Sequence, residues 1–424
     1  MKRIVYFVIF CLMLFPLASC SPSPAVSRTL RIVTDLGIMD GSSSCQETGL
    51  MDLEAIVQFY GGLPNNLELE LEVLPQEAED LHSRLTSLRT EIMSGKGPDL
   101  FILSTDWGDC FANQERLFPN PEKAAAGDFF LPVDHYLANA KHMDFNALIP
   151  QIMEVGKTEK GQTLLPMFFT VNTGATESLP ASVSWDEAIS GTNQIAAAAY
   201  AGGLRENNFR SMVLGEIANH QKEELLITQE ELLARIKEAL SLSVPEEEDA
   251  PGIWDTFLKL DFDSASEHTA YFPLRNCQQG LTARVNAFLA INKNSSHPDD
   301  AFALADMLMS REFLTLEGFW SETRTINQSQ TNLWYTLSLM CAYPVHQSLL
   351  DNETTIRYAL YIPQETLSVY HQILEQIDFV YIPANIDTLL EKLYAECLAA
   401  KDEAAVEKLV KEAYTTMKMM LAES

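Results

Sequence analysis

The stretch LHSRLTSLRTEIMSGKGPDLFILSTD, residues 81–106, contains a helix, a helix stop signal and a buried strand. Four apolar residues recur at spacings of four, three and four: Leu81, Leu85, Leu88 and Ile92. This spacing places them on one face of a helix that needs a sheet to cover it. Gly95 suits a left-handed cap, and Gly97-Pro98 prevents the helix from resuming. The run 100–103 is apolar on both faces, which predicts a strand inside a parallel sheet.

Polar and aromatic residues follow this strand directly. Asp106 and Trp107 stand at its carboxyl end, where open α/β sheets present groups to ligands. A tryptophan ring can stack on the apolar face of a sugar, while a carboxylate accepts hydrogen bonds from the sugar hydroxyls. A purely structural tryptophan is the alternative. We therefore predict Asp106 and Trp107 as ligand-contacting residues.

A helix running into S-G-K-G-P-D-L, a short apolar strand and an acidic residue resembles the extracellular solute-binding protein family 1, which includes maltose-binding protein. The resemblance returns at 280–312, where an apolar strand precedes a helix opened by Pro298, Asp299 and Asp300. These motifs cover about 80–170 and 280–315. The resemblance implies a two-lobed receptor that delivers small solutes to an importer of the ATP-driven (ABC) class, and it matches Asp106 to an acidic ligand-contacting position.

The expected fold class is α/β, with two lobes of the periplasmic-binding-protein type II fold. Each lobe would be a doubly wound sheet flanked by helices. The strictly alternating LELELEV, residues 67–73, predicts an edge strand and, with strands at 29–34 and 100–103, the order 2-1-3. Crossover strands are expected near 166–172 and 284–290. The predicted divisions are a signal peptide (1–19), a lipidated tether (20–28), lobe 1 (29–168 and 286–325) and lobe 2 (169–285 and 326–424).

Two features depart from the family pattern. The first crossover continues as Val171-Asn172-Thr173-Gly174, where the family has a tyrosine-asparagine-lysine signature. The glycine-tryptophan strand expected in lobe 2 has no clear counterpart, and Trp254 is a poor substitute. In the same lobe, a Thr228/Glu231 capping box begins a predicted helix.

Further ligand-contacting residues are predicted from their places at strand ends or crossovers. Asp35 follows the first strand, Phe168 and Asn172 lie in the first crossover, and Arg275 precedes the second. Strand ends and interlobe crossovers are where two lobes close over a small molecule.

The amino terminus predicts a lipid anchor. Lys2 and Arg3 precede the apolar run 4–17, and the small residues of LASC end at Cys20. This resembles a bacterial lipoprotein signal, with cleavage before Cys20 and lipidation of that residue. An uncleaved membrane anchor is the alternative. Either way the protein is expected at the cell membrane, anchored in the bilayer on its extracytoplasmic face.

Charge and cysteine content restrict the partners. The formal net charge is −30, which argues against nucleic acid. Besides Cys11 and Cys20 there are five cysteines without C-x-x-C spacing, so no metal site is predicted: Cys45, Cys110, Cys277, Cys341 and Cys397. Cys45 and Cys110 follow neighbouring strands and form the most plausible disulfide pair.

No enzyme signature is found. The sequence has no H-E-x-x-H, G-x-S-x-G, P-loop or dinucleotide motif, and His268 beside Glu267 reads as a polar loop. We predict a monomeric, non-enzymatic binding protein without catalytic residues or cofactor, whose ligand is a small molecule, most plausibly a sugar, and whose partner is the permease of an ABC importer. A solute-sensing lipoprotein without a transport role and a divergent hydrolase remain alternatives.

Overall fold

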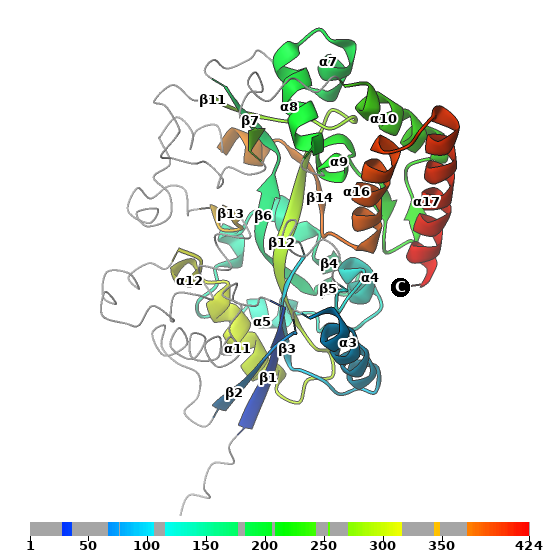
Figure 1. The fold of residues 1–424 in the computed structure, drawn as a ribbon. Helices are drawn as coiled ribbons and strands as arrows, with labels where there is room; N and C mark the ends of the chain where they lie inside the picture. Colours follow the sequence, from blue (N-terminus) through cyan, green and yellow to red (C-terminus); the bar gives the residue numbers. More distant parts are fainter. Residues whose placement is uncertain are drawn as a thin grey trace, which may run out of the picture.

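Two lobes joined by long strands make up the computed structural model (Figure 1). The structure describes residues 28–35, 67–75, 77–105, 115–176, 183–205, 208–242, 253–254, 270–315, 343–347 and 371–423. Each lobe has its own cluster of buried apolar side chains. The two-lobed α/β fold predicted from the sequence is therefore confirmed.

A seven-stranded sheet organises the first lobe. Its order is β13-β6-β12-β3-β1-β2, with β14 pairing with β12. The strands are β1 (Arg28–Thr34), β2 (Leu67–Val73), β3 (Leu100–Ser104), β6 (Leu164–Val171), β12 (Leu281–Ile291), β13 (Tyr343–Pro344) and β14 (Ile377–Tyr381). β1 runs parallel to both β2 and β3, which confirms the order 2-1-3 and the edge position of β2. β12 is antiparallel to β3, so the sheet is mixed rather than parallel as expected, because β12 returns from the other lobe.

The helix predicted from the 81–106 stretch is α3 (Ala78–Met93), and its predicted apolar face is buried. Gly95 ends it with a φ of 77°, a left-handed conformation that favours glycine. β3, which follows, is buried along its whole length. The other elements of this lobe are α4 (Pro121–Ala126), α5 (Asp134–Leu137), η3 (Phe145–Ala147), α6 (Pro150–Glu154), β4 (Lys157–Thr158), β5 (Gly161–Gln162), α11 (Pro298–Leu308) and α12 (Arg311–Thr315).

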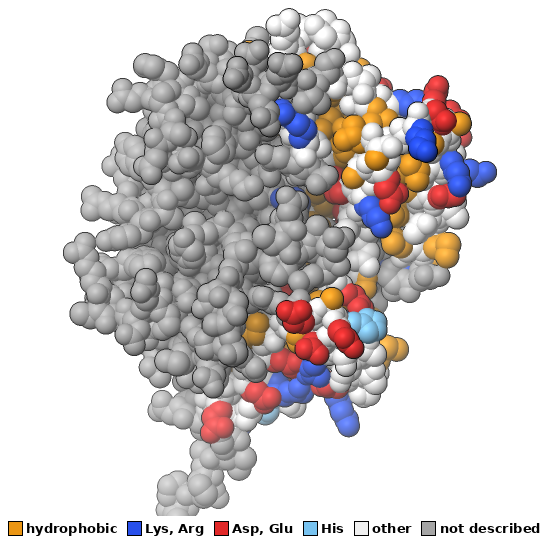
Figure 2. Space-filling model, viewed as in Figure 1, with side chains coloured by type: hydrophobic (Ala, Val, Ile, Leu, Met, Phe, Trp, Pro, Cys, Tyr) orange, Lys and Arg blue, Asp and Glu red, His pale blue; other side chains and the backbone are white. Residues whose placement is uncertain are grey.

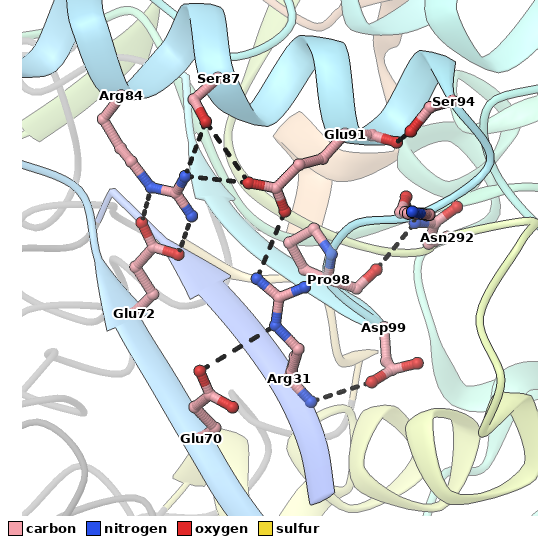
Figure 3. A network of polar contacts seen from close by, with 11 residues as sticks. Arg31, Glu70, Glu72, Arg84, Ser87, Glu91, Ser94, Pro98, Asp99 and Asn292 are labelled. Carbon is pink, nitrogen blue, oxygen red and sulfur yellow. Dashed lines mark hydrogen bonds and ion pairs between the residues drawn. The ribbon is translucent and has the colours of Figure 1, made fainter.

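Ion pairs cover the polar face of β2 (Figure 3). Arg84 of α3 binds both carboxylate oxygens of Glu72 and lies 3.1 Å from Glu91, while Arg31 of β1 lies 3.4 Å from Glu91. On the face drawn in Figure 2, acidic and basic side chains likewise lie close together at the lower end of the first lobe. The glutamates of the alternating strand are thus partly paired rather than simply solvated.

Two antiparallel strands, β6 and β12, join the lobes. β6 leads into β7 (Thr173–Thr176), which pairs in the second lobe with β10 (Ile253–Trp254) and β11 (Ala270–Pro273). β11 then leads into β12. The chain therefore leaves the first lobe and returns to it near the predicted crossover positions.

Helices form most of the second lobe. They are α7 (Trp185–Ser190), α8 (Gln194–Arg205), α9 (Phe209–Val213), α10 (Gln229–Ser241), α16 (Asn385–Leu398) and α17 (Glu403–Glu423), with the short strands β8 (Ala218–Asn219) and β9 (Glu224–Leu225). The predicted capping box of Thr228 and Glu231 begins α10. Among the described helices, none combines the length and the apolar character needed to cross a membrane.

Two sequence-based expectations need correction. Trp254 is part of a strand, because its backbone pairs with Thr173 at the entrance to the second lobe. The segment 326–424 was expected wholly in lobe 2, but β13 and β14 pair with β6 and β12, and Val345 belongs to the first core. β13 and β14 thus extend the first sheet along the two crossover strands.

Candidate functional site

The candidate site begins at the carboxyl ends of β1 and β3. Asp35 follows β1, and its Oδ1 accepts a hydrogen bond of 2.7 Å from the backbone N–H of Ser104, the last residue of β3. The two neighbouring parallel strands end side by side, so their terminal polar groups meet at one edge. The structure thus places the predicted residue Asp35 at the edge where a ligand was expected.

Burial dominates the electrostatics of Asp35. It raises the pKa of this carboxyl group to about 7, although hydrogen bonds from Ser104 and the positive charge of Arg116 lower it. Near neutral pH the group therefore exists in both protonation states. The carboxyl group can hydrogen-bond to a hydroxyl group in either state, and its ionised form can also pair with an amine cation.

The carboxyl end of β3 is also tied to the crossover strand β12. The N–H of Thr105 donates to the carbonyl of Asn286 at 2.8 Å, and its Oγ1 donates to the carbonyl of Val285. The register of β12 against β6 shifts between Val285 and Ala287, so Asn286 is an extra residue at this point. A movement of β12 would therefore also move Thr105, the residue that follows β3.

Phe168, Asn172 and Arg275 are not gathered around Asp35. Phe168 shares Ala287 as a strand partner with Ser104, but its side chain is 0% exposed and belongs to the first core. The Asn172 carbonyl accepts from Leu274, and the Arg275 guanidinium bonds to Gln279 and Gln376. Their predicted ligand roles remain predictions. Several other predicted positions lie outside the described residues: Cys20, Cys45, Asp106, Trp107, Cys110 and His268.

A cavity of about 400 Å³ lies between the lobes. Glu122 and Glu154 line it from the first lobe, Arg210 and His220 from the second, and Tyr381 from β14. The residues come from five separate parts of the chain, so no local sequence signal could have predicted their meeting. Among the described residues, no group of three or more His, Cys, Asp or Glu side chains is arranged to hold a metal ion.

Burial perturbs several groups around this cavity. It raises the pKa of Glu122 to about 8, although the backbone N–H of Ile382 and the charge of Arg210 act in the opposite direction. Burial also lowers the pKa of His220, whose Nδ1 lies 2.7 Å from Nδ2 of Asn120. The cavity therefore offers a protonated carboxyl group and a neutral imidazole at neutral pH.

Two side chains of the segment 116–123, in the first lobe, contact the second lobe beside this cavity. Arg116 Nη1 donates to the carbonyl of Pro383 at 2.7 Å, and Lys123 Nζ donates to the carbonyl of Leu421 at 2.6 Å. Lys123 also lies 2.9 Å from the carboxylate of Glu223. These contacts hold the start of α16 and the end of α17 against the first lobe.

Comparisons with known proteins identify the fold. No protein-family model matches the sequence, and no curated protein matches it either. Among solved structures, an extracellular solute-binding protein family 1 member from Alicyclobacillus acidocaldarius has a TM-score of 0.54 at 13% identity, covering 92% of this chain and 98% of its own. An oligogalacturonide-binding protein from Yersinia enterocolitica has a TM-score of 0.53 at 13% identity, covering 93% and 99%.

A de novo designed cysteine esterase is also similar, with a TM-score of 0.57 at 13% identity, covering 94% of this chain and 98% of its own. At such identities the likeness concerns the fold and not the ligand or any reaction. The chain therefore has the two-lobed α/β fold of extracellular solute-binding proteins.

Proposed function

We propose that this chain is an extracytoplasmic substrate-binding lipoprotein that captures a small solute, a carbohydrate, between its lobes for delivery to an ABC importer. The observation that carries the proposal is the pair of crossover strands, β6 and β12, which join two separately packed cores. Two cores joined by a few strands can rotate about them without losing their own packing. Binding between the lobes is the use that this architecture favours.

The mechanism follows from this arrangement and needs no chemical step. A solute that contacts both lobes favours the closed form by its extra affinity for that form. Asp35 and the carboxyl end of β3 would supply contacts from the first lobe, together with Asp106 and Trp107. The permease would then recognise lobe surfaces that only the closed form brings together.

Membrane attachment and lobe boundaries are part of the same proposal. Cys20 would carry the lipid, and residues 20–28 would be the tether. The first lobe would comprise 29–168 and 286–325, and the second would comprise 169–285 and the helices after β14. A tethered receptor stays close to its importer, which raises the local concentration of the solute-loaded form.

A thermal-shift screen of the chain without its first 20 residues tests the proposal. We would use maltotriose, cycloalternan, digalacturonic acid, amino acids and spermidine as probes. Because a specific ligand stabilises the folded state by mass action, a probe at about a hundred times its Kd should add about 2.7 kcal/mol to the unfolding free energy. Small-angle scattering should show a smaller radius of gyration with the same probe.

The alternatives give different results. Release of shorter sugars from an oligosaccharide probe would indicate a hydrolase. Binding without co-purification of a permease from membranes would favour a sensing role. No stabilisation by any probe would contradict the carbohydrate assignment and the solute-binding function together.

A further inference from the structure

Asn286 is a buried amide whose side-chain oxygen has no hydrogen-bond partner in the part of the chain that the structure describes. The residue is 2% exposed, and among the described residues nothing donates to its Oδ1. Its neighbours in β12, Val285 and Ala287, are fully buried apolar residues. An apolar side chain would suit this position better, because a buried polar atom without a partner destabilises the folded state.

A second asparagine just beyond the same strand shows the ordinary arrangement. Asn292 is 1% exposed, and its Nδ2 donates to the carbonyls of Lys96 at 3.1 Å and Pro98 at 2.8 Å. Its Oδ1 accepts from the N–H of Asn294 at 3.0 Å. Figure 3 shows this amide beside Pro98. Asn292 is therefore a structural amide. Its side-chain oxygen accepts a hydrogen bond within the fold, whereas the side-chain oxygen of Asn286 accepts none from the described residues.

Asn286 stands where the neighbours of β12 change. Ala287 pairs with Ser104, the end of β3, whereas Arg284 pairs with Tyr381, the end of β14. Val285 and Asn286 therefore lie at the point where the neighbour of β12 changes from β14 to β3. The backbone carbonyl of Asn286 accepts from the N–H of Thr105, and Asp35 accepts from the N–H of Ser104, so Asn286 and Asp35 both contact the carboxyl end of β3.

We propose that Asn286 is a ligand-contacting residue whose side-chain oxygen accepts a hydrogen bond from a hydroxyl group of a bound saccharide. The inference rests on the proposed solute-binding function and adds a residue from the crossover strand to the site. Asp35 and Asn286 then both present acceptors, which suits a solute with several hydroxyl donors. Bound solute would satisfy the amide and at the same time engage the strand that connects the lobes.

Paired substitutions test this assignment. Asn286→Val removes an unsatisfied group, so the melting temperature without solute should stay equal or rise. Affinity for whichever saccharide probe binds the wild-type chain should fall about tenfold, as expected for loss of one buried hydrogen bond. Asn292→Val should do the reverse, lowering the melting temperature and leaving the affinity within about twofold. Asn286→Ala is measured in parallel and replaces the valine variant if that one does not fold.

The outcomes separate the inference from the proposed function. If Asn286→Val or Asn286→Ala lowers the melting temperature as much as Asn292→Val does, the amide is structural and the inference is overturned. Unchanged saccharide affinity in the Asn286 variants also overturns it, while the binding function stands. If the wild-type chain binds no saccharide probe, the proposed carbohydrate function fails, and the role of Asn286 fails with it.

Discussion

Arg210 and Asp387 form a charged pair inside the second lobe, with Nε of the arginine 2.6 Å from Oδ1 of the aspartate. The side chains are only 4% and 8% exposed. Asp387 also accepts from the N–H of Ala384 at 2.8 Å, and Arg210 Nη1 donates to the carbonyls of Leu214 and Gly215 at 3.0 Å. The guanidinium carbon lies 4.1 Å from the ring centre of Tyr381. One pair thus joins α9, the start of α16 and β14 beside the interlobe cavity.

Removing one member of this pair should be costly. Asp387→Ala leaves the Arg210 charge buried without its partner, which should lower the unfolding free energy by about 3–5 kcal/mol in urea denaturation. The control is Glu396→Ala on the same helix, whose exposed carboxylate lies 3.9 Å from Lys392. Its loss should cost less than about 0.5 kcal/mol. Equal effects of the two substitutions would contradict the importance of the buried pair.

The first lobe allows a comparison between apolar burial and surface charge on α3. Leu88 is fully buried, so Leu88→Ala should lower the unfolding free energy by about 2–5 kcal/mol. Arg84→Ala removes the contacts with Glu72 and Glu91 drawn in Figure 3, but these groups are partly exposed. Its cost should be about 1 kcal/mol or less and should shrink as salt is added. If Arg84→Ala at low salt lowered the unfolding free energy more than Leu88→Ala does, and salt removed that effect, the ion pairs rather than the apolar face would hold the helix.

Local patterns in the sequence predicted the elements that local interactions determine. The spacing of Leu81, Leu85, Leu88 and Ile92 predicts the buried face of α3, and the alternation of 67–73 predicts an edge strand. Gly95 and the Thr228/Glu231 box mark helix ends by hydrogen bonds made within a few residues. Each of these features depends on contacts between near neighbours in the chain.

Long-range pairing explains what the sequence did not reveal. β10 is two residues long and β14 five, and each is held by strands far away in the sequence, so neither has a periodicity of its own. That the Asn286 side-chain oxygen lacks a donor among the described residues can be found only from the three-dimensional structure. The candidate site was only partly predictable for the same reason: Asp35 was expected from its strand-end position, but its proximity to Ser104 was not.

Lipid attachment can be tested without knowing the solute. Cys20→Ala in the full chain should abolish incorporation of a labelled lipid precursor and leave the melting temperature of the lobes unchanged, because the proposed tether precedes both cores. Cys277→Ala is a suitable control, since this thiol lies in the second lobe and is not in a signal motif. Continued labelling of the Cys20 variant would contradict the lipoprotein assignment.

The predicted residues beyond β3 should affect binding more than folding. A buried charge-assisted hydrogen bond contributes about 1.5–3 kcal/mol, so Asp106→Ala should weaken the saccharide probe identified by thermal shift roughly ten- to a hundredfold. Trp107→Ala should weaken it less, because an aromatic contact adds about 1 kcal/mol. Calorimetric titration measures both values. Melting temperatures that fall by several degrees while affinity stays constant would instead make these side chains structural.

Asp35 should make stability depend on pH in a predictable direction. Its pKa is about 7 in the folded chain, against an ordinary value of 3.8. Between these values the folded chain retains a proton that the unfolded chain has lost, so stability falls as pH rises from about 4 to about 7. Above about pH 7 Asp35 is ionised in both the folded and the unfolded chain, so stability no longer falls with pH through this group.

Asp35→Asn removes this dependence while its side-chain oxygen can still accept from the N–H of Ser104. The variant and the wild type should therefore melt at similar temperatures at pH 4, and the variant should melt higher at pH 8. Glu122→Gln is the matched comparison. Because the pKa of Glu122 is raised to about 8, the stability that its protonated form contributes should be lost over a pH range that extends to about 8. Melting temperatures are measured by circular dichroism at half-unit pH steps. Parallel curves for wild type and Asp35→Asn across pH 4–8 would show that the Asp35 carboxyl is ionised in the folded chain throughout, and that it presents a permanent negative charge to the solute.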